Sequence, residues 1–270
     1  MQGRVLIVAG SDSGGGAGIQ ADIKTVTTLG GYAATAVTAL TAQNTQGVFG
    51  VVSVDPHFVR EQMEVVLRDI GADAIKTGML HSVQVIETVA VTYERLGGRV
   101  PLIVDPVMVA KGGARLLDED ARRALVDRLL PLAALVTPNA PEATELTGRP
   151  VRVAEDLPAA ADRLLLLGPG AVLLKGGHLE GDTVVDLLRT ADGQQEQWES
   201  SRLRSTSTHG TGCTLASAAA TGIAQGLTLS AAVSRAREYV IRAIATAPGL
   251  GSGHGPLNHA HTLEGGPRSE

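Results

Sequence analysis

The sequence of 270 residues is poor in aromatic residues, has one cysteine and lacks any long apolar run. Phe, Trp and Tyr make up only 2% of it, so the core must be aliphatic, and nucleic-acid binding by rows of stacked rings is excluded. One cysteine forms neither an internal disulfide nor a multi-cysteine zinc site. The apolar run at residues 5–9 is too short for a signal peptide, and no stretch approaches the roughly 20 residues of a membrane span. These absences predict a soluble cytoplasmic protein with no membrane partner.

Charge is also scarce. Charged residues make up 19%, and 28 acidic against 23 basic side chains give a net charge of -5. This balance argues against a broad phosphate-binding surface, so no nucleic-acid partner is expected, although a local basic pocket is compatible with it. Hydrophobic residues reach 44%, enough for a sizeable core, and the 33 glycines cluster where the backbone itself is expected to be the working surface.

Short β-forming segments alternate with amphipathic helical windows along the chain. Strands separated by helices are typical of an α/β fold with a mostly parallel sheet covered on both faces. Asp192-Gly193, between strand patterns at 183–189 and 195–203, predicts a hairpin at a sheet edge. The other strands are predicted at 4–9, 33–40, 72–77, 102–105, 135–137 and 171–175, and the helices at 19–29, 56–69, 82–96, 118–130, 141–146, 155–167, 211–225 and 229–245.

No linker and no internal repeat interrupts this pattern, so a single domain is predicted over residues 1–250. Residues 251–270 are rich in Gly, Pro and His and are expected to form a loose C-terminal tail. His259 and His261 in that tail suggest metal binding, but a frayed terminus explains them better.

Ligands of such sheets bind beyond the carboxyl ends of the strands, where residues 10–18 form a first glycine-rich segment. It lacks the Gly-Lys-Ser/Thr ending of a Walker A loop. Gly16-Ala-Gly-Ile-Gln-Ala21 matches the loose dinucleotide pattern G-x-G-x-x-A, but no acidic residue lies between Asp22 and Asp55, and Gln43-Asn44 stands there instead. A nicotinamide-dependent oxidoreductase is therefore the weaker functional alternative. The structural alternative is that these glycines only form a tight turn between a strand and a helix.

A second glycine-rich segment, Ser207-Thr-His-Gly-Thr-Gly-Cys-Thr214, opens an alanine-rich helix. The amides of Thr211, Gly212 and Cys213 have no partner inside the helix, and with the helix dipole they form an anion hole suited to a transferring phosphoryl group. The same field is expected to lower the thiol pKa of Cys213, which makes the thiol a proton acceptor or hydrogen-bond partner for a substrate hydroxyl. The structural alternative is a small buried side chain filling the helix start.

Seven segments in one order carry a resemblance that no single one would carry: Gly10-Ser-Asp-Ser-Gly-Gly-Gly-Ala-Gly-Ile-Gln-Ala-Asp22, Thr38-Ala-Leu-Thr-Ala-Gln-Asn-Thr45, Lys76-Thr-Gly-Met-Leu80, Asp105-Pro-Val-Met108, Thr137-Pro-Asn-Ala-Pro-Glu142, Lys175-Gly-Gly-His178 and His209-Gly-Thr-Gly-Cys-Thr214. Over residues 5–245 the chain resembles the hydroxymethylpyrimidine/phosphomethylpyrimidine kinases of thiamine biosynthesis, a branch of the ribokinase superfamily. The resemblance implies a ribokinase-like three-layer αβα sandwich with no separate lid domain, ATP and Mg²⁺ as cofactors, a small aminopyrimidine substrate and a homodimer.

The resemblance also implies roles at the phosphate end of the site. Sugar kinases of the superfamily carry Gly-x-Gly-Asp at the anion hole, and this chain has Cys213 in place of the catalytic aspartate, with Gly210 opening the turn, as the pyrimidine-kinase branch does. Lys175 is expected to neutralise ATP phosphates, unless it is a surface lysine at a strand end. Asn139 and Glu142 are expected to bind ATP, unless Asn139 is an ordinary helix cap.

For the metal, Glu142 and Asp105 are the candidate ligands of a hydrated Mg²⁺, since carboxylate oxygens suit that ion. A structural hydrogen-bonding role is nearly as good an account of Asp105. The segment Lys111-Gly-Gly113 is a candidate flap over the site, since two glycines provide hinge freedom, and a plain surface turn is the alternative.

For the acceptor, Gln43 is the strongest candidate, because its amide both donates and accepts and so fits the ring nitrogen and exocyclic amine of an aminopyrimidine. A solvent-exposed loop glutamine is the alternative. Met79 and Val107 are expected to sandwich a flat ring, as the resemblance implies, although core packing explains them almost as well. Gly10 and Asp22 are further candidate members of the pocket.

The predicted activity is ATP-dependent phosphorylation of 4-amino-5-hydroxymethyl-2-methylpyrimidine and then of its monophosphate to the diphosphate. Three alternatives remain at this point. A pyridoxal or pyridoxine kinase of the same superfamily is the nearest, a nicotinamide-dependent oxidoreductase rests only on the glycine pattern at residues 16–21, and a non-catalytic pyrimidine sensor would not need the intact turn at Gly210.

Overall fold

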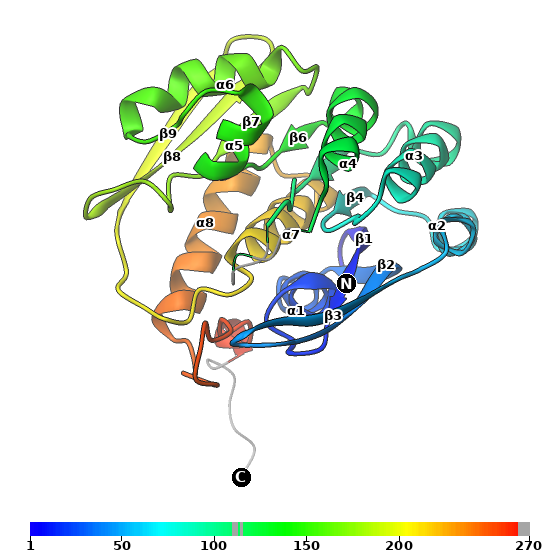
Figure 1. Cartoon of the computed structure of the whole chain (residues 1–270), viewed down its shortest axis with the longest axis horizontal. Coiled ribbons are helices and arrows are strands. Elements are labelled where there is room, and N and C mark those ends of the chain that lie inside the picture. Colours follow the sequence, from blue (N-terminus) through cyan, green and yellow to red (C-terminus); the bar gives the residue numbers. More distant parts are fainter. Residues whose placement is uncertain (110–112, 114–115, 264–270) are drawn as a thin grey trace.

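A nine-stranded sheet lies between two layers of helices in the computed structural model of the chain, which describes residues 1–109, 113 and 116–263 (Figure 1). Five short single turns join or extend the longer elements, at Tyr93–Gly97, Leu125–Leu129, Leu130–Leu132, Ala154–Asp156 and His261–Leu263. The strands are β1 (Arg4–Asp12), β2 (Tyr32–Asn44), β3 (Gly47–Ser53), β4 (Ala74–Thr77), β5 (Leu102–Val104), β6 (Leu135–Val136), β7 (Ala171–Leu174), β8 (Thr183–Thr190) and β9 (Gln195–Ser201). The helices are α1 (Gly18–Thr28), α2 (Pro56–Asp69), α3 (Val83–Thr92), α4 (Glu119–Ala124), α5 (Ala140–Thr147), α6 (Leu157–Leu165), α7 (Thr211–Ala224) and α8 (Leu229–Ala245).

The strand order is β3-β2-β1-β4-β5-β6-β7-β8-β9, and the pairs from β2 to β7 are all parallel. The pair of β2 with β3 is antiparallel, as are the pairs that β8 makes with β7 and β9. The predicted α/β fold with a mostly parallel sheet and an edge hairpin is confirmed. Parallel strands place their carboxyl ends at one edge, which is where loops from distant parts of the sequence meet.

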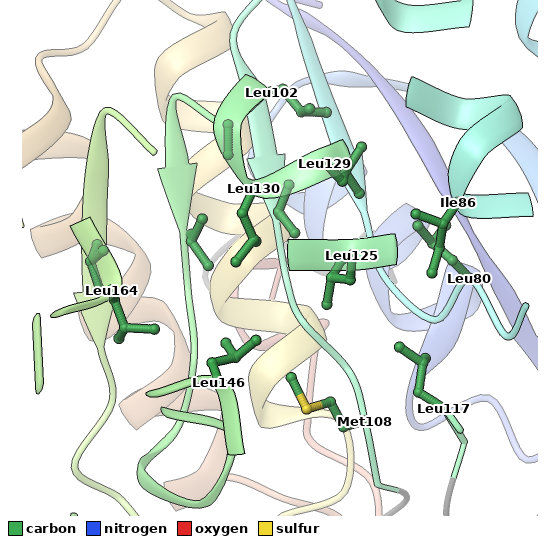
Figure 2. Packing of buried hydrophobic residues seen from close by; sticks show 14 of the residues in the cluster. Leu80, Ile86, Leu102, Met108, Leu117, Leu125, Leu129, Leu130, Leu146 and Leu164 are labelled. Atoms are coloured by element: carbon green, nitrogen blue, oxygen red, sulfur yellow. The ribbon is translucent and has the colours of Figure 1, made fainter. Parts of the chain in front are cut away.

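Apolar side chains of β1 show why helices cover both faces of the sheet. Leu6 and Val8 belong to one hydrophobic cluster, and Val5 and Ile7 belong to the other, because successive side chains of a strand point to opposite faces. All four are at most 1% exposed. Figure 2 shows part of the first cluster, which includes Leu102 of β5, Leu146 of α5, Leu164 of α6 and Ile86 of α3. No helix among the described residues is long and apolar enough to cross a bilayer.

The edge strand β3 was not predicted from the sequence. It pairs with β2, but most of its residues face solvent, with Phe49 71% and Val52 66% exposed. It therefore lacks the apolar alternation by which a half-buried strand is usually detected.

Residues 251–263 pack against the body of the protein. The prediction of a loose tail over residues 251–270 is therefore wrong for residues 251–263. Leu257 and His259 are each 4% exposed, and the amide of His254 donates to the carbonyl oxygen of Thr45 at 2.8 Å. The glycines that suggested looseness instead permit close approach: a Cβ at Gly253 would lie 2.1 Å from the Thr45 oxygen. Figure 1 shows this segment beside the β2–β3 hairpin. The single domain over residues 1–250 stays a prediction, and residues 264–270 lie outside the described chain.

Candidate active site

A cavity of about 680 Å³ opens at the carboxyl ends of the parallel strands, next to the first turns of α5 and α7. Every predicted site residue except Asp22 lines this cavity: Gly10, Gln43, Met79, Asp105, Val107, Asn139, Glu142, Lys175, Gly210, Thr211, Gly212 and Cys213. The structure thus places residues more than 200 positions apart around one space, and the roles of these residues stay predictions. Of the candidate flap, Lys111 and Gly112 lie outside the described residues.

The first turn of α7 carries the amides predicted to bind a phosphoryl group. Gly210 is its N-cap in the left-handed region, with φ 83°, and no side chain caps the helix. The first helical hydrogen bond runs from the amide of Thr214 to the Gly210 carbonyl at 2.9 Å. Among the described residues, nothing accepts a backbone hydrogen bond from Thr211, Gly212 or Cys213. These amides therefore face the cavity at the positive end of the helix dipole.

Lys175 supplies a cation at the same place. It follows β7, and a Cβ added at Gly212 would lie 3.3 Å from its Nζ. The ammonium is 3.2 Å from Oδ1 of Asp105, which also accepts from the Thr137 hydroxyl at 3.2 Å. Burial disfavours the charge on Lys175, but the carboxylates of Asp105 and Glu142 outweigh it and raise its pKa. The lysine is therefore charged, and the interpretation as a plain surface lysine is wrong, because its side chain is only 13% exposed.

The thiol of Cys213 lines the cavity but is not the ionised group that the helix field predicted. Burial raises its pKa to about 12; Lys76 opposes this rise, while Asp22 and Asp105 add to it. The prediction of a lowered pKa is wrong because loss of water around the thiol raises the pKa more than Lys76 and the hydrogen bond from the Gly18 amide lower it. The thiol is neutral at physiological pH, so it offers a weak hydrogen bond rather than a base.

Asn139 and Glu142 form a reciprocal capping box at the start of α5. Oδ1 of Asn139 accepts from the Glu142 amide at 2.9 Å, and Oε2 of Glu142 accepts from the Asn139 amide at 2.7 Å. The helix-cap alternative is confirmed, although both side chains also line the cavity. Burial and Asp105 raise the pKa of Glu142 to about 7 against the attraction of Lys175.

Asp22 does not reach the cavity, so its predicted place in the pocket is wrong. It is 0% exposed, and both of its carboxylate oxygens lie 2.9 Å from Nζ of Lys76, itself fully buried in β4. The Ser217 hydroxyl donates to the same carboxylate at 2.7 Å. A buried lysine requires a buried counterion, and Asp22 fills that role beneath the floor of the site.

The side chain of Gln43 is held from several directions. It follows an irregularity in the β2–β3 register, of the kind that redirects side chains. Ser13 fixes its backbone, accepting from the amide of Gln43 and donating to its carbonyl, both at 2.8 Å. At the side chain, the Thr41 hydroxyl lies 3.2 Å from Oε1, and Nε2 of His209 lies 3.2 Å from the amide nitrogen.

Two residues of the site were missed in the sequence, Asp12 and His209. Asp12 is 3% exposed and accepts from the amides of Gly14, Gly16 and Ala17, so it organises the glycine-rich loop after β1. Burial disfavours its charge, but hydrogen bonds from His209 and from these amides lower its pKa overall. The available signal was an aspartate two residues before a glycine run, which is typical of a side chain capping loop amides.

A helix start with unpartnered amides beside a lysine that is 13% exposed, on a mostly parallel α/β sheet, is the arrangement expected of a phosphotransferase with a ribokinase-like fold. A family model described as Phosphomethylpyrimidine kinase matches residues 12–258. The chain belongs to this family, the phosphomethylpyrimidine kinases.

Two curated relatives match nearly the whole chain. The Thiamine biosynthesis bifunctional protein ThiED of Geobacter sulfurreducens is 54% identical over 264 residues, which are 97% of this chain and 53% of that protein. The chain thus spans about half of that relative. The Hydroxymethylpyrimidine/phosphomethylpyrimidine kinase of Streptomyces coelicolor is 50% identical over 261 residues, 96% of this chain and 95% of that one.

Solved structures give the same fold. An ADP complex of Bacillus subtilis pyridoxal kinase matches with a TM-score of 0.88 and 33% identity, over 98% of this chain and 99% of that one. The phosphomethylpyrimidine kinase of Clostridium difficile 630 matches with a TM-score of 0.79 and 39% identity, over 89% of this chain and 99% of that one. The three-layer ribokinase-like architecture expected from the sequence is confirmed.

Proposed function

We propose that this chain phosphorylates the hydroxymethyl group of 4-amino-5-hydroxymethyl-2-methylpyrimidine with ATP and then converts the monophosphate to the diphosphate, as a step of thiamine biosynthesis. The observation that carries this proposal is the common cavity of Gln43, Cys213 and Lys175, which joins an amide suited to an aminopyrimidine to a phosphoryl-binding helix start. A relative that is 50% identical to the chain carries this activity in its name, and a relative that is 54% identical is named for thiamine biosynthesis.

Phosphoryl transfer proceeds here by attack of the substrate hydroxyl oxygen on the γ-phosphorus of ATP, while the bond to the β–γ bridging oxygen breaks and ADP leaves. The amides of Thr211, Gly212 and Cys213 hold the transferring group, and Lys175 balances its charge. The neutral thiol of Cys213 orients the hydroxyl by a hydrogen bond. A loose transition state demands little early deprotonation, so the hydroxyl proton departs late, to an oxygen of the transferred phosphoryl group, and no thiolate is required.

The aminopyrimidine ring occupies the other end of the cavity. Gln43 donates to the ring nitrogen and accepts from the exocyclic amine, and Met79 and Val107 contact the two ring faces. The methyl end of Met79 leaves no room for a side chain at Gly10, where a Cβ would lie 2.5 Å from it. Gly10 therefore makes room for the Met79 side chain, against which the ring is proposed to pack.

Mg²⁺ fits the site as an ion that arrives with the nucleotide. Among the described residues no group of three or more His, Cys, Asp or Glu side chains could hold a metal ion alone. Glu142 and Asp105 each have one oxygen engaged by protein donors, which leaves oxygens for a hydrated ion that keeps its waters and binds phosphates. When bound, the ion neutralises charge on the phosphate oxygens. A homodimer in the cytoplasm remains part of the proposal.

A pyridoxal kinase is the second candidate, because the solved structure of such a kinase matches with a TM-score of 0.88. Steady-state kinetics with the pyrimidine alcohol and with pyridoxal, with product analysis by mass spectrometry, tests the two. We expect kcat/KM for the pyrimidine alcohol to be at least about tenfold higher, and both mono- and diphosphate to form. A higher kcat/KM for pyridoxal would overturn the proposal in favour of the second candidate.

A further inference from the structure

His209 and Asp12 form a buried pair behind the side chain of Gln43, and the proposed mechanism does not use them. Nε2 of His209 lies 2.9 Å from Oδ2 of Asp12 and 3.2 Å from the amide nitrogen of Gln43. The side chains of Asp12 and His209 are 3% and 11% exposed. One ring nitrogen therefore meets both a carboxylate and the amide that faces the substrate.

The surroundings fix the position of the imidazole ring. A Cβ at Gly16 would lie 2.5 Å from Cδ2 of His209 and 3.2 Å from Cβ of Pro256, so the ring fits between the glycine loop and the C-terminal segment. The His209 amide donates to the carbonyl oxygen of Gly255 at 3.1 Å. The ring thus lacks room to swing away from Gln43.

The ring proton of His209 acts on the orientation of the Gln43 amide together with the Thr41 hydroxyl, which donates to Oε1 when the amide nitrogen faces the ring. Asp12 is an ionised acceptor, because its pKa lies below the ordinary value, and it requires a proton on Nε2 of His209. With that proton, Nε2 donates to the carboxylate and also to an amide oxygen turned toward it. With the amide nitrogen toward the ring, Nε2 must instead accept, and Asp12 would face a lone pair. The two orientations therefore differ in energy because of Asp12.

We propose that His209, held by Asp12, is a positioning residue that sets the orientation of the Gln43 amide and thereby the choice of acceptor ring. This inference rests on the proposed function. An aminopyrimidine presents a ring acceptor beside an amine donor, so only one orientation of the amide matches both groups. A pyridoxine-type ring presents a different pattern and depends less on that orientation.

A double-mutant cycle tests this inference in the full-length enzyme. His209→Leu fills the space of the ring without an N–H group, and His209→Gln keeps a donor at comparable reach. We expect His209→Leu to raise KM for the pyrimidine alcohol about tenfold, with kcat and KM for ATP changed less than about twofold. His209→Gln restores most of the loss, and the ratio of kcat/KM for the pyrimidine alcohol over pyridoxine falls in His209→Leu.

In the Gln43→Ala background, His209→Leu should add less than a twofold change, because an effect through Gln43 disappears with Gln43. Fully additive effects, or an equal rise in KM for ATP, would overturn the inference and assign His209 to the anion hole instead. His209→Ala replaces His209→Leu in the cycle should the leucine variant not fold. Absence of product with the wild-type enzyme counts against the proposed function rather than this inference, and the same cycle is then run on the dissociation constant of the pyrimidine alcohol, which needs no turnover.

Discussion

The thiol of Cys213 is held neutral by burial, and this state is measurable because the chain has no other cysteine. With a pKa of about 12, the thiolate fraction below pH 9 is about a thousandfold lower than for a thiol of ordinary pKa. Since the thiolate is the reactive species, alkylation of the folded protein by iodoacetamide should be slow and should rise with pH to at least pH 10 without a plateau.

The same protein unfolded in urea provides the reference rate for this labelling, and Cys213→Ser should show none. A plateau below about pH 9 in the folded protein would mean that the field of α7 outweighs burial after all. The measured labelling curve therefore decides between a hydrogen-bonding thiol and a base.

A residue could be assigned from the sequence when its role depends on its own chemistry or on its neighbours in the sequence. Residues whose partners are far away in the sequence could not be assigned in this way. Gln43 was predicted from the chemistry of its amide, and Lys175 from the family resemblance, with its place after a buried strand as the local sign. Asp22 was assigned wrongly because its partner Lys76 is 54 positions away, and nothing local shows that this carboxylate turns inward. His209 was missed because its contact with Asp12 spans 197 positions.

At the scale of elements, the turn into α7 requires glycine at its cap. Gly210 has φ 83°, and a Cβ there would lie 1.9 Å from the carbonyl oxygen of Gly16. We expect Gly210→Ala to destabilise the protein by about 2–4 kcal/mol, from left-handed strain and overpacking together, and to lower kcat at least about tenfold by displacing the amides proposed to bind the phosphoryl group. Urea unfolding and steady-state kinetics measure both effects.

Gly226, just after the other end of α7, is the matched control. Its φ is 85°, yet nothing lies within 4 Å of an added Cβ. Gly226→Ala should therefore cost only about 1–2 kcal/mol of stability and leave kcat unchanged. Equal kinetic losses in the two variants would mean that the close contact between Gly210 and Gly16 has no part in shaping the site.

Elements with buried apolar faces were predictable, and those without them were not. The strands β1, β4, β5 and β7 were found from short apolar runs that the helices cover on both faces. The exposed edge strand β3 gave no such signal. The segment after residue 250 was misjudged because glycines suggest flexibility, whereas at Gly253 the missing side chain permits a close contact.

At the scale of the whole molecule, the C-terminal segment joins parts of the chain that meet at the cavity. It contacts Thr45 near the Gln43 end and the His209 loop near the first turn of α7. The sheet order predicts that ligands bind at this edge. The packing of the last described residues beside the cavity depends on contacts between residues far apart in the sequence, and composition alone does not reveal such contacts.

His259 anchors this segment and makes the stability of the whole fold depend on pH. It is 4% exposed, its Nε2 lies 2.9 Å from the Thr214 hydroxyl, and its carbonyl accepts from the Tyr239 hydroxyl at 2.7 Å. Burial, helped by Lys24 and His261, lowers its pKa to about 4 from 6.5. The unfolded chain therefore binds a proton at a higher pH than the folded protein does. The neutral His259 side chain makes its full contribution to the free energy of unfolding above pH 6.5, and this contribution is lost as pH falls from 6.5 through 4.

Between pH 7 and 5 the wild type should lose about 2 kcal/mol more stability than His259→Gln, which keeps a hydrogen-bonding side chain but does not titrate. Urea unfolding at both pH values measures this difference, and parallel losses in the two proteins would show that His259 is not the group that titrates.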